Sequence, residues 1–68
     1  MTTRLIVHLR DYRKNAGLTQ AELAAAVGVS RKTINTIENG VFTPSTILAL
    51  GLAQYLACSV HDLFALPD

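Results

Sequence analysis

Residues 19–40 read TQAELAAAVGVSRKTINTIENG, and this stretch predicts two short helices joined by a tight turn. Thr19 and Glu22 have the spacing of a capping box, in which each side chain satisfies a free backbone N–H at a helix start. Gly28 suits the left-handed conformation that ends the first helix, and Ser30 suits the N-cap of the second. Helices at 20–27 and 31–38 therefore predict a helix-turn-helix over about residues 19–38.

The same signals predict three more helices on either side of this stretch. Apolar residues at helical spacing indicate a first helix that ends at Gly17, with the stripe Leu5, Leu9, Tyr12 and Ala16. Ser45 caps a fourth helix that continues to about Leu56, and Ser59 begins a short fifth helix over residues 60–64. Nothing alternates with period two over a useful length, so the expected fold is all-α, with five short helices.

Length and composition restrict the class of protein. The chain has 68 residues, which leaves room for a single domain over 1–68, and half of them are hydrophobic, as in an ordered globule. It lacks the pattern of a secretory signal and any apolar run of the roughly 18 residues that span a membrane. We therefore expect a soluble, cytoplasmic protein that does not contact membranes.

Charge is distributed unevenly along the chain, although the formal net charge is only +1. All six basic residues lie in the first 32 positions beside two acidic ones, which gives that segment a charge of +4. Residues 33–68 contain three acidic residues and no Lys or Arg, which gives −3. This asymmetry predicts that one face of the molecule meets a polyanion; a chance distribution of eleven charges is the alternative.

The helix predicted at 31–38 carries the side chains expected of a surface that reads DNA. Its outward face presents Arg31, Lys32, Asn35 and Thr36. In the major groove an Arg pairs with guanine, an Asn pairs with adenine, and a Thr methyl contacts the thymine methyl. We therefore predict that these four residues contact bases.

Three other polar residues flank this surface. Gln20 and Ser30 stand at helix N-termini, which suit phosphate because free backbone N–H groups point outward there. Thr33 lies beside the outward face of the same helix. We assign these three to the DNA backbone, where they would fix the register of the protein on the duplex.

The run QAELAAAVGVSRKTINTIENG, within the longer span from Leu9 to Phe64, resembles the phage-repressor-like, Cro/Xre-type helix-turn-helix family. The resemblance covers about four-fifths of the chain. It implies a lambda-repressor-like domain of five short helices and a small transcriptional regulator, most often a repressor, that binds double-stranded DNA in a sequence-specific manner.

The resemblance also implies roles for single residues. Gln20 matches a position that donates to a phosphate, and Asn39 matches one near the backbone after the recognition helix. The base-contacting positions fall on Arg31, Lys32 and Thr36, with Asn35 at a flanking position. Arg13 and Glu38 match a buried ion pair that ties the first helix to the end of the third. A lone charge at either site would be costly.

Three departures from the family pattern bear on function. Residues 41–43 are Val-Phe-Thr, where relatives often carry a Lys or Arg that reaches phosphate, which predicts weaker phosphate binding. Ile47 and Gly51 replace polar residues on the fourth helix. Ala57 stands where a glycine usually reverses the chain. Either Ala57 takes the left-handed conformation at a cost in strain, or the fourth helix ends differently and the last helix is displaced.

The apolar fourth helix predicts a contact with another protein chain, although a larger core is the alternative explanation. Short regulators of this kind are often homodimers on palindromic operators, so a homodimer is expected. The predicted dimer or partner surface comprises Ile47, Gly51, Tyr55, Val60, Phe64 and Leu66. The competing hypothesis is a protein-interaction role, such as the antitoxin of a toxin–antitoxin pair, which can still bind DNA.

The remaining reactive residues predict no chemistry. His8 and His61 lie far apart, without the Cys/His/carboxylate spacing of a zinc site, so we expect no metal and no cofactor. Cys58 falls at an aliphatic position of the family and is interpreted as a buried structural thiol rather than a redox sensor. So small a helical domain offers no deep cleft for catalysis, and we do not expect an enzyme.

Overall fold

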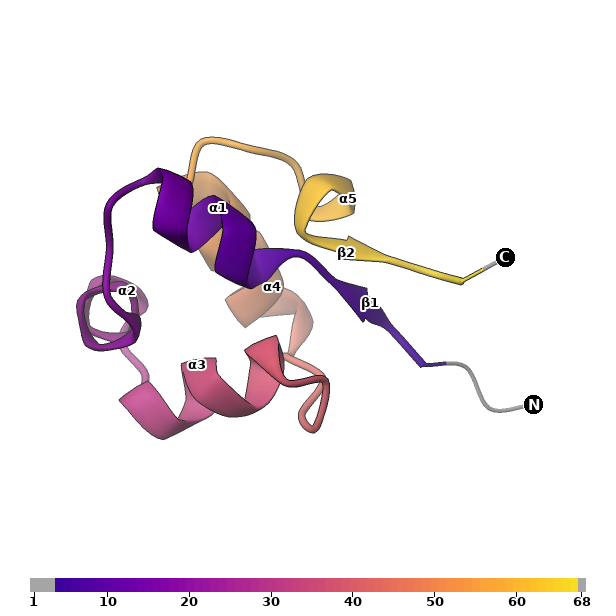
Figure 1. The fold of residues 1–68 in the computed structure, drawn as a ribbon, viewed down its shortest axis with the longest axis horizontal. Helices are drawn as coiled ribbons and strands as arrows, with labels where there is room; N and C mark the ends of the chain where they lie inside the picture. Colours follow the sequence, from indigo (N-terminus) through magenta and orange to yellow (C-terminus); the bar gives the residue numbers. More distant parts are fainter. Residues whose placement is uncertain (1–3, 68) are drawn as a thin grey trace.

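Five short helices and a pair of strands make up residues 4–67, the part of the chain that the computed structural model describes (Figure 1). Residues 1–3 and 68, the ends of the predicted 1–68 domain, lie outside the described residues. The elements in chain order are β1 (Ile6–Val7), α1 (Leu9–Asn15), α2 (Gln20–Val27), α3 (Arg31–Glu38), α4 (Thr46–Tyr55), α5 (Val60–Leu63) and β2 (Phe64–Ala65). The predicted five-helix architecture is confirmed.

The turn between α2 and α3 has the local chemistry that the sequence predicts. The Thr19 hydroxyl accepts from the Glu22 backbone N–H at 3.0 Å, and the Glu22 carboxylate accepts from the Thr19 N–H at 2.8 Å. Gly28 ends α2 at a φ of 76°. The Ser30 hydroxyl then caps α3 by accepting from the Thr33 N–H at 3.2 Å. These bonds satisfy backbone donors that a helix start otherwise leaves free.

One hydrophobic cluster joins all five helices. Its members are Leu9, Leu23, Ala24, Ile34, Ile37, Leu52, Ala53, Leu63 and Phe64. Six of these large apolar side chains are fully enclosed, and each contributes about 1.5–3 kcal/mol relative to exposure to water. Because α2 and α3 both bury residues in this cluster, the core fixes the orientation of α3 relative to the rest of the molecule.

The two-stranded sheet was not predicted, and it shortens two predicted helices. Leu5 precedes α1, which begins only at Leu9, and Phe64 belongs to β2 rather than to the last helix. Ile6 pairs with Ala65 and Val7 with Phe64 in antiparallel register. The His8 N–H donates to the Leu63 carbonyl at 2.8 Å, which continues this pairing to the start of α1. The β-branched side chains of Ile6 and Val7 favour the extended conformation.

The reversal after α4 places Ala57 in the left-handed conformation, with a φ of 56°, which is the first of the two alternatives that the sequence leaves open. Its N–H donates to the Gln54 carbonyl at 3.2 Å, and the Cys58 N–H donates to the Ala53 carbonyl at 3.0 Å. This is the Schellman pattern, which usually has a glycine at the left-handed position. Three other helices do end at a glycine with φ of 74–76°. The alternative, in which α5 is displaced, is therefore wrong.

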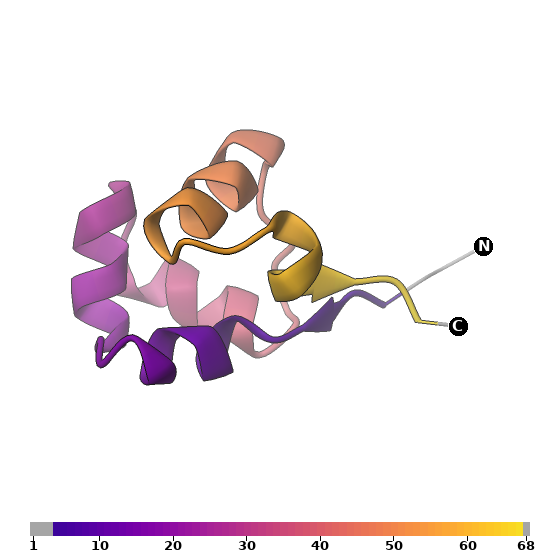
Figure 2. The same ribbon diagram turned by 90° about the horizontal axis from the view of Figure 1, so that it is seen from above.

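Helix α4 lies between α2 on one side and α5 on the other (Figure 2). Its inner face contributes Leu52 and Ala53 to the core, while Ile47, Leu50 and Tyr55 remain exposed. Within residues 4–67, no helix is both long enough and apolar enough to cross a membrane.

Candidate nucleic-acid interface

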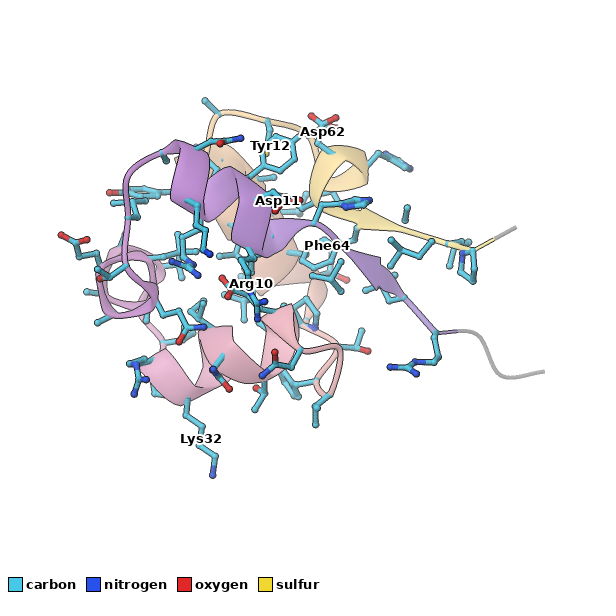
Figure 3. The ribbon with its side chains drawn as sticks, in the orientation of Figure 1. Arg10, Asp11, Tyr12, Lys32, Asp62 and Phe64 are labelled. Atoms are coloured by element: carbon cyan, nitrogen blue, oxygen red, sulfur yellow. The ribbon has the colours of Figure 1, made fainter. Side chains whose placement is uncertain are left out.

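Helix α3 presents its two basic residues to solvent. Arg31 and Lys32 form the first turn of the helix, and both side chains are exposed. Lys32 extends away from the rest of the molecule, on the side of α3 opposite to α1 (Figure 3). The opposite side of α3 buries Ile34 and Ile37 completely. The apolar residues thus fix which way the helix faces, and the basic residues project outward.

The remaining predicted base contacts on α3 are half-buried and hydrogen-bonded. The Thr36 hydroxyl donates to the Thr33 carbonyl at 3.0 Å, which leaves its methyl group and its oxygen lone pairs for other partners. The Thr33 and Ser30 hydroxyls lie 3.0 Å apart, beside the start of α3. The Ser30, Thr33 and Thr36 side chains therefore have defined orientations before any ligand arrives.

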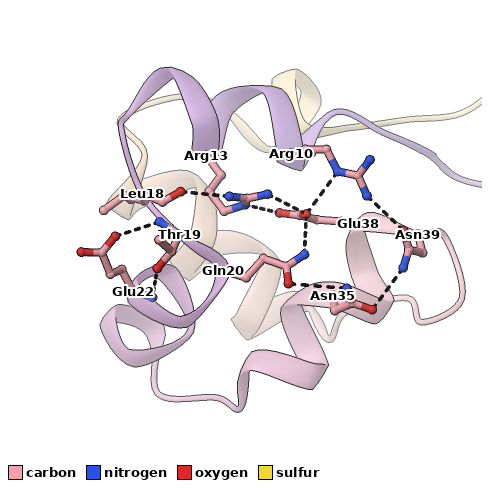
Figure 4. A network of polar contacts seen from close by, with 9 residues as sticks. All are labelled: Arg10, Arg13, Leu18, Thr19, Gln20, Glu22, Asn35, Glu38 and Asn39. Carbon is pink, nitrogen blue, oxygen red and sulfur yellow. Dashed lines mark hydrogen bonds and ion pairs between the residues drawn. The ribbon is translucent and has the colours of Figure 1, made fainter.

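Five polar side chains form a closed ring of hydrogen bonds across α1, α2 and α3 (Figure 4). Glu38 accepts from Gln20 Nε2 at 3.0 Å, and Gln20 Oε1 accepts from Asn35 Nδ2 at 3.4 Å. Asn35 Oδ1 accepts from Asn39 Nδ2 at 3.1 Å, and Asn39 Oδ1 accepts from Arg10 Nη2 at 3.1 Å. Arg10 Nε closes the ring on Glu38 at 3.4 Å. The ring holds three of the predicted DNA-contacting amides in fixed orientations.

The ring leaves Asn35 equipped to bind a base. One Nδ2 hydrogen and one Oδ1 lone pair of Asn35 take part in the ring. A side-chain amide has two donors and two acceptor lone pairs, so one of each remains. An adenine edge requires one donor and one acceptor from such an amide. Asn35 thus keeps the groups that this contact needs, without breaking the ring.

Glu38 lies at the centre of the polar network, and its side chain is inaccessible to solvent. Arg13 Nε approaches Glu38 Oε2 at 2.6 Å, and Arg13 Nη2 donates to Oε1 at 3.1 Å. Arg13 Nη1 also donates to the Leu18 carbonyl at 2.9 Å, which ties α1 to the segment before α2. The residues matched to the family's ion pair are therefore in direct, bidentate contact, the strong form of such a pair.

The charge state of the pair follows from these contacts. Burial by itself raises the pKa of Glu38, but hydrogen bonds from Arg13 and Gln20 and the charge of Arg13 outweigh burial, so the pKa lies below its usual range. The hydrogen bond to Glu38 raises the pKa of Arg13, against the opposing effect of burial. Both groups are therefore charged at neutral pH.

Arg10 is a member of the network that the sequence analysis did not identify. It lies on α1 with half of its side chain exposed, and it contacts both Glu38 and Asn39. The only sequence signal for it is its position one helical turn before Arg13, which places both residues near the same face of α1.

Five of the six residues of the predicted dimer or partner surface line two grooves beside α4, and Leu66 lines neither. One groove, of about 500 Å³, lies between α2 and α4 and includes Ile47, Gly51 and Tyr55; we call it the α2-side groove. The other, of about 230 Å³, includes Val60 and Phe64 and lies between α4 and α5; we call it the α5-side groove.

The residues of this surface differ widely in exposure. Ile47 is 84% exposed, Leu66 is 74% exposed and Tyr55 is 51% exposed, so all three are available to a partner. Phe64 is only 6% exposed and belongs to the core, so its assignment to the outer surface was wrong. Its place in β2, paired with Val7, turns its side chain inward. Val60 is half-buried and packs against the core.

Within residues 4–67, Cys58 and the ionisable residues outside the network form no recognisable chemical site. Cys58 is half-buried against the core, and burial raises the pKa of its thiol, with a smaller effect from the charge of Asp62. The thiol is therefore protonated at neutral pH and a weak nucleophile. Among residues 4–67, no group of three His, Cys, Asp or Glu side chains is arranged to hold a metal ion.

Comparison with known proteins identifies the family. The model of the helix-turn-helix family matches residues 9–63. An HTH-type transcriptional regulator of Methanothermobacter thermautotrophicus is 46% identical over 61 residues, 88% of each chain. The regulator YgzD of Bacillus subtilis is 33% identical over 60 residues, 88% of this chain and 91% of its own. The chain belongs to the helix-turn-helix family of Cro/Xre type.

Solved structures show the same fold. The P22 c2 repressor in complex with a synthetic operator has a TM-score of 0.75 and 34% identity, over 78% of this chain and 80% of the repressor. The restriction-modification controller protein C.AhdI from Aeromonas hydrophila has a TM-score of 0.76 and 34% identity, over 82% of this chain and 81% of its own.

Proposed function

We propose that this protein is a transcriptional regulator that binds double-stranded DNA through α3. The observation that carries the proposal is the geometry of α3, whose buried residues fix the helix while Arg31 and Lys32 project from its first turn. A major groove about 12 Å wide admits such a helix. The similarity to the P22 c2 repressor, a structure that contains operator DNA, supports the proposal.

Within this function the polar residues have distinct roles. We assign base contacts to Arg31, Lys32, Asn35 and Thr36, and backbone contacts to Gln20, Ser30, Thr33 and Asn39. Base contacts set the preferred sequence, whereas backbone contacts fix register without reading sequence. The polar ring supports both roles, because it orients the side chains before binding and so reduces the entropy lost on DNA.

The test of this function is the selection of bound duplexes from a random library by the wild-type protein at a stated salt concentration. We expect a defined motif to be enriched, built from two inverted half-sites about 10 base pairs apart. Recovery of no common motif, with binding equal on all duplexes, would show that the protein does not read sequence.

The inverted half-sites follow from a proposed homodimer that uses the α5-side groove. Exposed apolar side chains occur in or next to the segments that line this groove: Ile6, Phe42, Leu50 and Leu66. A second copy would cover these residues while leaving α3 free. Two recognition helices about 34 Å apart would then meet successive major grooves on one side of the duplex. Occupying a promoter in this way would repress transcription.

A second candidate function is the binding of another protein at the α2-side groove. None of the described residues lining it is charged, and Ile47 at its edge is 84% exposed. Exposed apolar surface with polar surroundings often marks a protein contact. This role, which includes that of an antitoxin, does not use the residues of α3 that are assigned to DNA, because none of them lines the groove.

A further inference from the structure

The C-terminal end of α3 carries positive charge although the chain after it supplies none. Residues 33–68 contain no Lys or Arg, so the segment that follows α3 has no cation of its own. Two guanidinium groups nevertheless lie beside the two residues that follow the helix, Asn39 and Gly40. Arg10 Nη2 donates to Asn39 Oδ1 at 3.1 Å, and Arg4 Nη2 lies 3.7 Å from the position that a Cβ on Gly40 would occupy.

These two arginines come from different segments that the fold brings to the same end of α3. Arg10 lies on α1 and is also held by Glu38. Arg4 precedes β1, and β1 is paired with β2 through Ile6 and Val7. Arg4 lies outside α1, which begins only at Leu9. The sheet therefore anchors the segment that carries Arg4. This gives the unpredicted sheet a role in placing a cation beside α3.

Much of the charge at this end of α3 is not neutralised. Glu38 alone pairs with both Arg10 and Arg13, so one carboxylate serves two guanidinium groups. Among residues 4–67, no carboxylate lies within ion-pair distance of the Arg4 guanidinium. Arg4 is exposed, and half of the Arg10 side chain is exposed. Both guanidinium groups can therefore still donate to an anion.

The spacing of these cations fits a helix whose first turn lies in the major groove and whose last turn lies near the edge of the groove. Arg31 and Lys32 stand at the first turn of α3, and Arg4 and Arg10 stand at its last turn. An eight-residue helix is about 12 Å long, which is close to the width of the major groove. With Arg31 and Lys32 at the bases inside the groove, Arg4 and Arg10 at the other end of α3 would lie toward a phosphate strand at the edge of the groove.

We propose that Arg4 and Arg10 each bind a DNA backbone phosphate at the C-terminal end of α3. The inference rests on the proposed function, because it identifies a contact on the same surface. The two arginines would supply the positive charge that residues 41–43 lack. The competing explanation is structural: a cation near a helix C-terminus also stabilises the helix dipole. The two explanations predict different effects of substitution at Arg4.

The test compares R4Q and R4K with K14Q, a matched loss of one exposed positive charge on α1. Affinity is measured for the selected duplex and for a random duplex, from 50 to 300 mM KCl. Loss of one phosphate contact should lower the slope of log K against log salt by about 0.9 and weaken binding about fivefold at 0.15 M salt. R4Q should show this loss equally on both duplexes, whereas R4K and K14Q should stay close to wild type.

Thermal unfolding without DNA separates the structural explanation. R4Q should unfold at the same temperature as wild type if Arg4 serves phosphate. An unchanged salt slope, an equal loss for K14Q, or a lowered unfolding temperature that accounts for the weaker binding would overturn the inference. None of these would touch the proposed function, which fails only if the wild-type protein selects no DNA motif.

Discussion

The surfaces of α3 and α4 differ in how their side chains are held. On α3 and its neighbours, the polar side chains bond to one another in a closed ring around the inaccessible Glu38. On α4, Ile47, Leu50 and Tyr55 are exposed without any such arrangement. The first surface is organised before a ligand arrives, as a DNA-reading surface should be. The second leaves apolar area in water, which is the kind of surface that often marks a contact with another chain.

Removing Glu38 should have the largest effect, because it breaks the organised surface at its centre. E38A leaves the Arg13 guanidinium buried without a counter-charge, since the Arg13 side chain is only 9% exposed. Breaking a buried pair in this way costs about 3–5 kcal/mol, which is much of the stability of so small a domain. Urea unfolding measures this loss in the free energy of unfolding. The double variant R13M/E38L should recover most of the loss; no recovery would show that the pair contributes more than charge balance.

Acid provides a second test of the same pair. The pKa of Glu38 is lower in the folded chain than in the unfolded one. Its contribution is therefore complete above the ordinary carboxyl pKa and is lost as the pH falls through the lower, folded value. Wild type should lose stability as the pH falls from about 5 toward 3, the range around an ordinary Glu pKa. E38Q should show a flatter profile; equal profiles would remove Glu38 from the acid response.

A matched pair of substitutions on α4 tests which groove holds the second copy. Leu50 borders the α5-side groove and Ile47 the α2-side groove, and both are exposed. L50E should raise the dimer dissociation constant at least 30-fold, about 2 kcal/mol, because the charge occurs twice in a symmetric apolar seam. I47E should leave it unchanged. Sedimentation equilibrium decides between them: dissociation by I47E alone would move the dimer to the other groove, and a wild-type monomer at high micromolar concentration would exclude it.

A substitution at Gly51 on α4 should have a smaller effect, on the stability of the isolated chain. It lies inside α4, where glycine is about 1 kcal/mol less favourable than alanine, and a Cβ there would have nothing within 4 Å. G51A should therefore stabilise the isolated chain by about 0.5–1 kcal/mol in urea unfolding. A destabilised variant would mean that the added methyl group meets a neighbouring side chain.

An effect of similar size is expected at Ala57, at the end of the same helix. Its φ of 56° costs an L-residue roughly 1 kcal/mol or more, and glycine removes that cost while adding freedom to the unfolded chain. A57G should raise the free energy of unfolding by about 0.5–1 kcal/mol net. A glycine variant less stable than wild type would refute strain at this turn.

The helices and their caps could be predicted because each depends on residues a few positions apart. Ser30, Ser45 and Ser59 cap three helices as their spacing predicts. The strained turn at Ala57 was also predictable, since two helices had to be joined there within two residues. The sheet was not predictable, because strands of two residues are too short to show alternation. That error also misplaced Phe64 on the surface.

The polar ring could not be predicted from spacing. Arg10 and Asn39 are 29 residues apart, and Gln20 and Asn35 are 15 apart, so only the packing of α1, α2 and α3 brings them together. The Arg13–Glu38 contact came from resemblance to a family rather than from the chain itself. The place of Arg4 beside Gly40 depends on the sheet and had no signal in the sequence.

The most direct test of the account compares wild type with R31A on the selected duplex and on a scrambled duplex. Arg31 is exposed in the first turn of α3, with the reach and donors to bind a guanine edge. R31A should lose roughly 1–3 kcal/mol of binding on the selected duplex, much less on the scrambled one, and discrimination at one position per half-site. An equal loss on both duplexes would mean that Arg31 contacts only phosphate, and α3 would not read the sequence through it.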